Sequence, residues 1–377
     1  MAFRSGGRAS GRLVRPKAPP YGLQEPPERT VRVFSRPRAR APVVRPTALP
    51  SIGRMSGLRA WWAGRSPAAG AAVMATGIVS TALLLIGAET ASRVALVLAA
   101  VLWVALGAGF VRRLVVDRDR WAAEARSPGA LTAVAATAVL GSRLSASGRQ
   151  APAAALLALA TLLWAVLLPV VVGHWRPRMP GSVFLACVAT EALAAPAAAL
   201  AAAEHTAWLA RAALVLFWLG LVIYAFALPR FDLRQVLEGP GDQWVAGGAL
   251  ALSTLAGAGL LAAGNGGLYL WNDDDRATLR ITTAVLLAVS LAVYLTLLVA
   301  EAVRPRPGYD HRRWATVFPM GMTAAATLSV ASAMSVPWLR VPGRVLVWVA
   351  VAAWLWVAAA MVADAVRATR AGAAAPH

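Results

Sequence analysis

Long uncharged stretches alternate with short charged loops from Arg65 to the end of the chain. A helix needs about 20 mainly apolar residues to cross the hydrocarbon core of a bilayer, and most of these stretches meet that length. The pattern therefore predicts an all-α polytopic membrane protein with ten transmembrane helices. The third is the weakest, because it is short and Arg143 interrupts it. The helices are expected at 67–87, 92–112, 128–145, 150–172, 180–203, 207–228, 243–263, 278–301, 314–336 and 343–366.

The odd-numbered predicted helices differ in composition from the even-numbered ones. The first, fifth, seventh and ninth contain Gly, Pro, Ser or Thr, whereas the second, fourth and tenth are mostly Leu, Val, Ala and Trp. Small and hydroxylated residues allow close helix packing, and Pro or Gly allows kinks. Two interpretations remain open. The pattern is either ordinary small-residue packing or an inner ring of odd helices around a polar path, in which case five helical hairpins form a degenerate repeat.

The segments at either end of the hydrophobic region have a different composition. Residues 1–65 are rich in Arg, Pro and Gly and lack apolar periodicity, so we expect a disordered basic tail that lies near anionic lipid. Met55 begins the segment MSGLRAWWAGRSP, which has the form of a translation start directly before the first predicted helix. It remains open whether residues 1–54 are upstream sequence that was assigned to the protein in error. One transmembrane transport domain is then expected over 66–367, with a disordered C-terminal tail at 368–377.

Composition excludes most soluble classes of protein. Hydrophobic residues make up 59% of the chain and charged residues only 14%, with a mean hydropathy of +0.61. A soluble globule could not cover its surface with so little charge. The single Cys187 excludes an internal disulfide and a thiolate metal site, and no lysine follows Lys17 to serve an ATP-binding loop. No nucleophile–base pair is evident, so we expect no enzyme, no metal and no cofactor.

The net charge of +20 does not indicate nucleic-acid binding. Of the 37 basic residues, 14 lie within 1–65, and the rest sit between apolar stretches without aromatic interleaving. Their distribution instead predicts orientation, because cytoplasmic loops of membrane proteins are rich in arginine. With both termini in the cytoplasm, the inner loops hold 15 arginines and the outer loops eight. The 15 lie at 112–126, 176–178, 230–234, 304–313 and 367–370.

Three segments carry a resemblance to a known family. SPAAGAAVMATGIVS (66–80), WVAGGALALSTLAGAGLL (244–261) and YDHRRWATVFPMGMTAAAT (309–327) resemble the first, seventh and ninth helices of the tellurite-resistance/dicarboxylate transporter family. That family includes TehA-type tellurite-resistance proteins, fungal malate permeases and sulfite efflux pumps, and plant slow anion channels. The resemblance spans about 66–366. It implies five helical hairpins around a central pore, commonly in a homo-trimer.

The same resemblance suggests which residues form the pore. In similar channels a Phe on the ninth helix blocks the pore near mid-membrane, so Phe318 is the candidate gate, and the adjacent Pro319 provides a kink that aims the ring inward. Hydroxyl groups on the odd helices are plausible lining groups, although they are equally able to bond back to their own helix. The pore-lining candidates are Thr76, Gly77, Ser80, Glu191, Ser253, Thr254, Pro319 and Thr323.

Glu191 is the one acidic residue deep within a predicted span. An ionised carboxylate there would cost several kcal/mol, so Glu191 is expected to face the bundle interior or a wet cavity and to be uncharged. Three roles remain open for it. It hydrogen-bonds a neighbouring helix, carries a proton with an organic anion, or weakens anion access from a polar vestibule.

The expected function is movement of small inorganic or organic anions across the cytoplasmic membrane, for example chloride, nitrate, sulfite or malate. One alternative is proton-coupled uptake of C4-dicarboxylates such as malate, and another is export of sulfite or tellurite. A membrane scaffold that transports nothing is a further, different class. Anion flux in proteoliposomes separates these hypotheses.

Overall fold

The computed structural model describes residues 70–265, 273–305 and 310–373. The predicted tail at 1–65 and the start of the first predicted span lie outside these residues. Throughout the described ranges the secondary structure is helical, and the only strand-like feature there is an isolated bridge between Met179 and Phe231. The prediction of an all-helical protein is therefore confirmed.

Five of the helices pack into a ring in which each contacts two others. Around the ring, α2 contacts α5, α5 contacts α7, α7 contacts α10, α10 contacts α12, and α12 returns to α2. The interior location of these helices is clearest for α7, α10 and α12, where 83–89% of the apolar window is buried. We call these five the inner helices; their bounds are α2 Gly70–Leu85, α5 Thr132–Ser145, α7 Leu185–Ala203, α10 Val245–Asn265 and α12 Trp314–Ala333.

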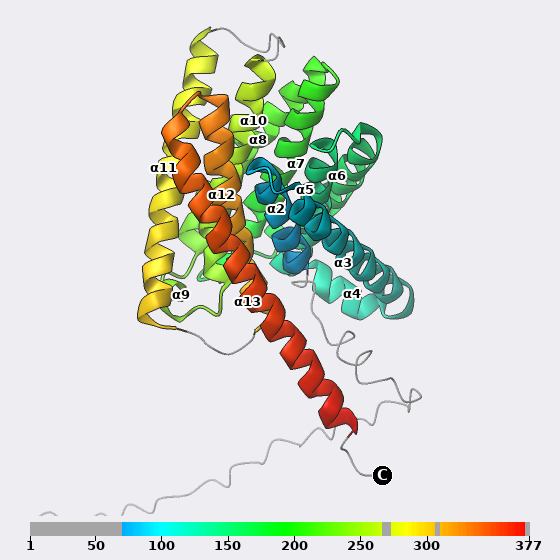
Figure 1. Cartoon of the computed structure of the whole chain (residues 1–377). Helices are drawn as coiled ribbons and strands as arrows, with labels where there is room; N and C mark the ends of the chain where they lie inside the picture. Colours follow the sequence, from blue (N-terminus) through cyan, green and yellow to red (C-terminus); the bar gives the residue numbers. More distant parts are fainter. Residues whose placement is uncertain (1–69, 266–272, 306–309, 374–377) are drawn as a thin grey trace, which may run out of the picture. The chain divides into compact units, whose positions relative to one another are not determined.

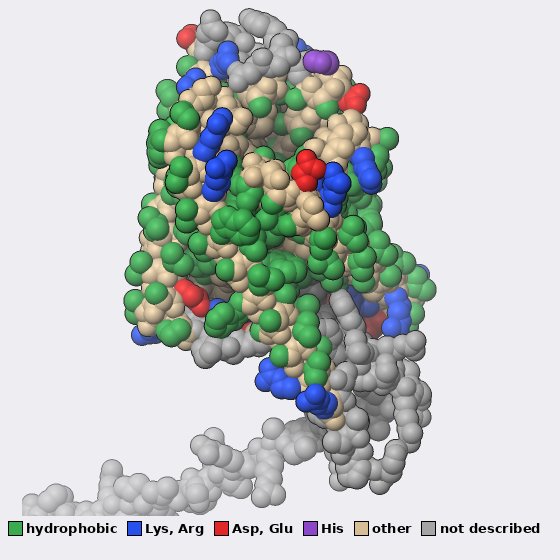
Figure 2. Space-filling model, viewed as in Figure 1, with side chains coloured by type: hydrophobic (Ala, Val, Ile, Leu, Met, Phe, Trp, Pro, Cys, Tyr) green, Lys and Arg blue, Asp and Glu red, His purple; other side chains and the backbone are tan. Residues whose placement is uncertain are grey.

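The other five long helices lie outside the ring, and each packs against the inner helix that precedes it in the chain (Figure 1). Only 11–33% of their apolar windows is buried. Large apolar side chains such as Val97, Leu162 and Trp356 are more than 60% exposed. Figure 2 shows a broad hydrophobic surface with charged side chains gathered toward its ends, as expected of a lipid-facing surface. These outer helices are α3 Glu89–Val116, α6 Gln150–Val172, α8 Ala207–Ala227, α11 Asp273–Val303 and α13 Arg340–Ala373.

Short elements occupy the connections between helices. Four inner helices begin with a 3₁₀ turn, and this shared start indicates a structural repeat. These turns are η2 Pro128–Leu131, η3 Gly181–Phe184, η5 Asp242–Trp244 and η6 His311–Arg313. The remaining short elements are α4 Arg118–Ala125, η4 Leu228–Arg230, α9 Gln235–Glu238 and η7 Pro337–Leu339.

The repeat is also visible as sequence identity between two helix starts, whereas the sequence analysis inferred it from polarity alone. SPAAGAAVMAT (66–76) and SPGALTAVAAT (127–137) are identical at S, P, A, A, V, A and T in the same order. Both segments end on a threonine that accepts a hydrogen bond from a tryptophan of a neighbouring hairpin. The bonds run from Trp103 Nε1 to Thr137 Oγ1 at 2.9 Å and from Trp354 Nε1 to Thr76 Oγ1 at 3.0 Å.

A third bond of the same kind runs from Trp164 Nε1 to Thr190 Oγ1 at 2.9 Å. In each case an outer helix donates to the inner helix of the next hairpin: α3 to α5, α6 to α7, and α13 to α2. A hydrogen bond of this type in a bilayer contributes about 0.6–2 kcal/mol. These bonds therefore tie successive hairpins together around the ring.

The structure agrees only in part with the predicted spans. Within the described residues, eight helices are long and apolar enough to cross a membrane, which confirms a polytopic membrane protein. By contrast, α2 has 16 described residues and α5 has 14. The C-terminal tail was predicted to begin at residue 368, but α13 continues to Ala373. Alanine favours helix, and Arg370 in the last turn complements the helix dipole, so the helix extends beyond the apolar span.

Glycines mark the seams where inner helices approach most closely. A Cβ atom at Gly181 would lie 2.6 Å from both the carbonyl carbon of Asp242 and Cα of Gln243, where α7 and α10 begin. Because these atoms belong to the backbone, they cannot move aside without shifting a helix. The close approach of α7 and α10 therefore requires glycine at this position.

We expect Gly181→Ala to lower the stability of the folded protein by about 3 kcal/mol, the upper end of the range for overpacking. Thermal unfolding in detergent would report this as a lower midpoint. Gly107→Ala is the matched control, because a Cβ atom at Gly107 of α3 meets nothing within 4 Å. Equal midpoints for the two variants would contradict the argument.

Candidate functional site

The starts of the inner helices surround a cavity of about 670 Å³. Each of the five inner helices contributes at least one lining residue, and α4 covers one side with Arg120, Ala123 and Glu124. Successive inner helices are separated by one outer helix, so all five run in the same direction. Their amino ends therefore meet at one end of the ring. One lining residue from each inner helix, in chain order, is Met74, Thr132, Leu185, Val245 and Phe318.

This arrangement favours negative charge in the cavity. The first backbone N–H groups of a helix have no partner within it, and its dipole places about half a positive charge at the amino end. Five parallel helices that begin around one cavity add their positive ends. A small anion is therefore stabilised there without a buried basic side chain.

Charged side chains at the cavity are nearly balanced. Glu124 Oε1 lies 3.2 Å from Arg120 Nε, and Glu124 Oε2 lies 3.2 Å from Arg113 Nε. Arg312 and Asp242 line another part of the cavity. Asp242 is only 7% exposed, and its Oδ1 has no hydrogen-bond partner in the part of the chain that the structure describes. The helix ends, more than an excess of arginine, are thus the main source of positive potential at the cavity.

Phe318 is the cavity-lining residue furthest along α12. It is six residues beyond Arg312, which is about 9 Å deeper along the helix, and it is only 1% exposed. Pro319 follows it within α12, and Gly248 of α10 makes room for both. A Cβ atom at Gly248 would lie 3.3 Å from Phe318 Cε1 and 2.7 Å from Pro319 Cγ. The Phe318 ring is thus held against α10 in the cavity wall.

The other pore-lining candidates are absent from the residues that line this cavity. Most of the hydroxyl groups bond to the carbonyl four residues earlier in their own helix. Thr76 donates to Ala72 at 2.7 Å, Thr254 to Leu250 at 2.8 Å, and Thr323 to Pro319 at 2.9 Å. Local back-bonding therefore satisfies these donors.

Two further candidates, Ser80 and Gly77, lie at contacts between helices. Ser80 Oγ donates to the carbonyl of Ser92 on α3 at 2.7 Å. A Cβ atom at Gly77 would lie 2.8 Å from Cγ1 of Val139 on α5. Both residues contribute to packing between helices in this structure.

Glu191 lies in the wall of the ring, between α7, α8 and α10. It is fully buried, its Oε1 accepts a hydrogen bond from Ser253 Oγ at 3.0 Å, and the carboxyl group packs against Gly220 of α8. Ser253 also contacts the carbonyl of Ala249, at 3.1 Å. Glu191 Oε2 has no hydrogen-bond partner among the described residues. These contacts match the hydrogen-bonding role among the three that the sequence left open.

The sequence analysis missed the polar residues of the cavity. Thr132, Arg120 and Asp242 belong to helix starts or loops far apart in the chain, and loop charges in a membrane protein are usually solvated. The available signal was the repeated Pro or Gly just before the inner helices, at Pro128 and Gly181. Among the described residues no group of three or more His, Cys, Asp and Glu could hold a metal ion.

Comparison with known families identifies the fold's relatives. The family described as voltage-dependent anion channel matches residues 65–362, which is most of the chain. The chain belongs to this family. It is the family of the TehA, plant slow anion channel and malate permease types, so the resemblance seen in three helices is confirmed. No protein with curated annotation matches at a significant level.

Membership in the family and the eight apolar helices together indicate a multi-pass membrane protein that passes anions. Members of the family are channels or transporters and not enzymes.

Labelling with a thiol reagent tests whether the cavity is open to water. We expect Ala315→Cys, on the cavity wall, to react quickly with a small charged methanethiosulfonate reagent in the folded protein. The natural Cys187 is fully buried, so the parent protein provides an unreactive background. Ala75→Cys is the control, because Ala75 lies on α2 and is 0% exposed. Equal labelling of the two variants would contradict an open cavity.

Proposed function

We propose that this protein moves small anions along the axis of the five inner helices, with Phe318 as the gate. The observation that carries the proposal is the cavity: all five inner helices begin around it, and the nearly fully buried Phe318 is the lining residue furthest along α12. Converging helix dipoles attract an anion to the cavity, and a ring-shaped side chain at its inner end blocks further passage.

The proposed membrane arrangement is ten helices in five hairpins around a central path. The closed ring of inner-helix contacts supports it, as do the 3₁₀ turns at four helix starts and the exposed apolar faces of the outer helices. The short helices α2 and α5 cross within the ring, where protein rather than lipid surrounds them. A homo-trimer is part of the proposal on the basis of the family resemblance alone.

The proposed orientation has both termini in the cytoplasm and the cavity open to the cytoplasm. The arginine bias of the loops supports it, since the richer loops join the helices at the cavity end. The membrane is then the cytoplasmic membrane of a bacterial cell. In sealed vesicles of known orientation, the thiol of Ala315→Cys reports the side directly, because an impermeant reagent reaches it only from the cytoplasmic face.

Replacement of the gate side chain tests the path. We expect Phe318→Ala to raise anion conductance in planar bilayers at least tenfold, because removal of the ring joins the cavity to the rest of the path. Phe217→Ala is the matched control: Phe217 is also fully buried, but it lies on the outer helix α8 beside Trp218. Unchanged currents in Phe318→Ala, at equal membrane abundance, would reject Phe318 as the gate.

The substrate class proposed is small inorganic and organic anions, such as chloride, nitrate, sulfite and malate-like dicarboxylates. Export of sulfite or tellurite is compatible with the same path. A scaffold without transport would show no flux with any of these anions under any gradient. A flux assay with this panel of anions therefore separates the classes.

A second candidate, proton-coupled dicarboxylate uptake, depends on Glu191. The observation in its favour is a fully buried carboxyl group with one unpartnered oxygen. Against it, Glu191 is absent from the cavity lining and faces Ser253 and Gly220 in the helical wall. The geometry supports the structural role better.

We therefore expect Glu191→Gln to keep both its anion flux and the dependence of that flux on a pH gradient, because glutamine keeps the size and the hydrogen bond with Ser253. Uptake of radiolabelled malate into proteoliposomes, with and without an inward proton gradient, measures this. Glu191→Leu is the comparison, since it loses the hydrogen bond and should lower protein stability. Loss of only the pH-driven uptake in Glu191→Gln would establish proton coupling instead.

A further inference from the structure

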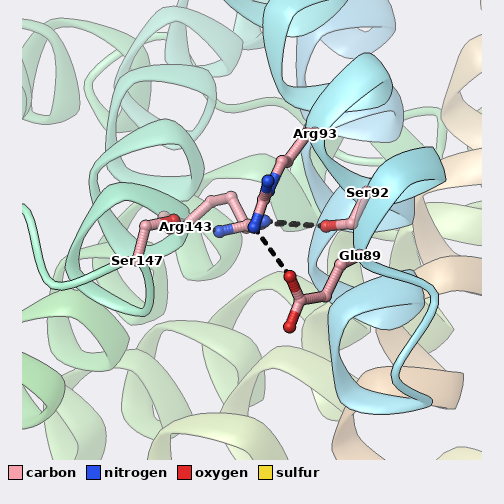
Figure 3. Close-up of polar contacts among 5 residues, drawn as sticks. All are labelled: Glu89, Ser92, Arg93, Arg143 and Ser147. Carbon is pink, nitrogen blue, oxygen red and sulfur yellow. Dashed lines mark hydrogen bonds and ion pairs between the residues drawn. The ribbon is translucent and has the colours of Figure 1, made fainter.

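A buried arginine lies at the end of the inner ring opposite the cavity. Arg143 belongs to the last turn of α5 and is only 2% exposed. Its Nε donates to Ser80 Oγ at 3.0 Å, its Nη2 to Ser92 Oγ at 2.8 Å, and its Nη1 to Ser147 Oγ. Figure 3 shows the guanidinium group directed from α5 toward α3. It thereby joins α5 to α2 and α3.

Hydroxyl groups solvate this cation but do not neutralise it. The serine protons point to backbone carbonyls: Ser80 Oγ donates to Ser92 O at 2.7 Å, Ser92 Oγ to Ser80 O at 2.6 Å, and Ser147 Oγ to Arg143 O at 3.0 Å. Their lone pairs are thus free to accept from the guanidinium group.

No carboxylate in the described part of the chain forms an ion pair with Arg143. The acidic residue drawn nearby, Glu89, is bound to Arg93 Nη2 at 2.7 Å, and both of these side chains are more than 60% exposed (Figure 3). The positive charge of Arg143 is therefore buried without a direct ion pair, and Glu89 acts on it only at longer range. Burial in a low-dielectric setting also protects it from screening by salt.

This end of the ring would otherwise repel an anion. The five inner helices run in parallel, so their carboxyl ends, each with about half a negative charge, converge here. A second arginine offsets the negative charge at the end of α12. Arg280 Nη2 of α11 donates to the carbonyl of Met334 at that helix end, at 3.2 Å. An anion that passes the gate must leave through this region.

We propose that Arg143 is a specificity-determining residue, which offsets the negative helix ends so that anions, and not cations, traverse the far half of the path. The inference rests on the proposed function. Arg143 acts through its electric field and does not need to touch the anion. Packed helices are 8–10 Å apart, so a guanidinium group at the α2–α5 seam lies on the order of 10 Å from the axis of the ring.

The first test removes the charge. In planar bilayers with a potassium chloride gradient, the reversal potential gives the permeability ratio of chloride to potassium. We expect Arg143→Gln to lower this ratio about tenfold and Arg143→Lys to keep most of it. Arg93→Gln is the matched control, because Arg93 lies at the same end but is exposed and paired with Glu89. A merely structural arginine would change abundance and not selectivity.

The second test leaves Arg143 in place, so it does not depend on the folding of its variants. Ser147 is exposed on the last turn beyond α5, and its Oγ already contacts Arg143. Ser147→Asp adds a carboxylate beside the guanidinium group and should lower the chloride-to-potassium ratio as Arg143→Gln does. Ser147→Asn, which is uncharged, should leave the ratio unchanged.

The outcomes are distinguishable from those of the proposed function. A parent protein that passes chloride, with Ser147→Asp at the same permeability ratio as the parent, overturns the inference and leaves the anion path standing. A parent protein and Phe318→Ala that both pass no anion overturn the anion path and the role of Arg143 together.

Discussion

Close approach of the inner helices is the constraint on which the rest of the structure depends. Five helices can form so tight a ring only if their backbones nearly touch, and glycine permits that contact. Gly77 meets Val139 between α2 and α5, Gly248 meets Pro319 between α10 and α12, and Gly321 lies where a Cβ atom would be 2.8 Å from Ile78 Cγ2 of α2. Larger side chains at these seams would widen the ring and move Phe318 of α12 away from Gly248 of α10.

Lipid supplies no hydrophobic force that pushes these helices together, because the lipid tails are as apolar as the helix surfaces. Close packing and a few hydrogen bonds must hold the ring instead. Polar groups in the wall supply two of these hydrogen bonds, one from Trp164 to Thr190 and one from Ser253 to Glu191. The positive amino ends of the inner helices are the attraction that we propose for an anion at the cavity, and Arg143 is proposed to offset the negative helix ends at the opposite end of the ring.

Sequence analysis predicted the helices and the family because both depend on local signals. A long apolar run and a motif such as SPAAGAAVMATGIVS are complete within one helix. The direction in which a hydroxyl group points is not local. Thr76 and Thr323 were expected near the path because they are polar, yet a threonine in a membrane helix satisfies its donor with the carbonyl one turn earlier. The cavity was missed because its wall is assembled from five helix starts.

The bond between Trp354 and Thr76 joins residues 278 positions apart in the chain. A ribosome releases the first hairpin into the membrane long before α13 exists. Until the α12–α13 hairpin is inserted, α2 lacks one of its two neighbours among the hairpins, and the ring of inner helices stays open on that side. Among the described helices, the ring is therefore closed late, when α12 packs against α2 and Trp354 of α13 bonds to Thr76.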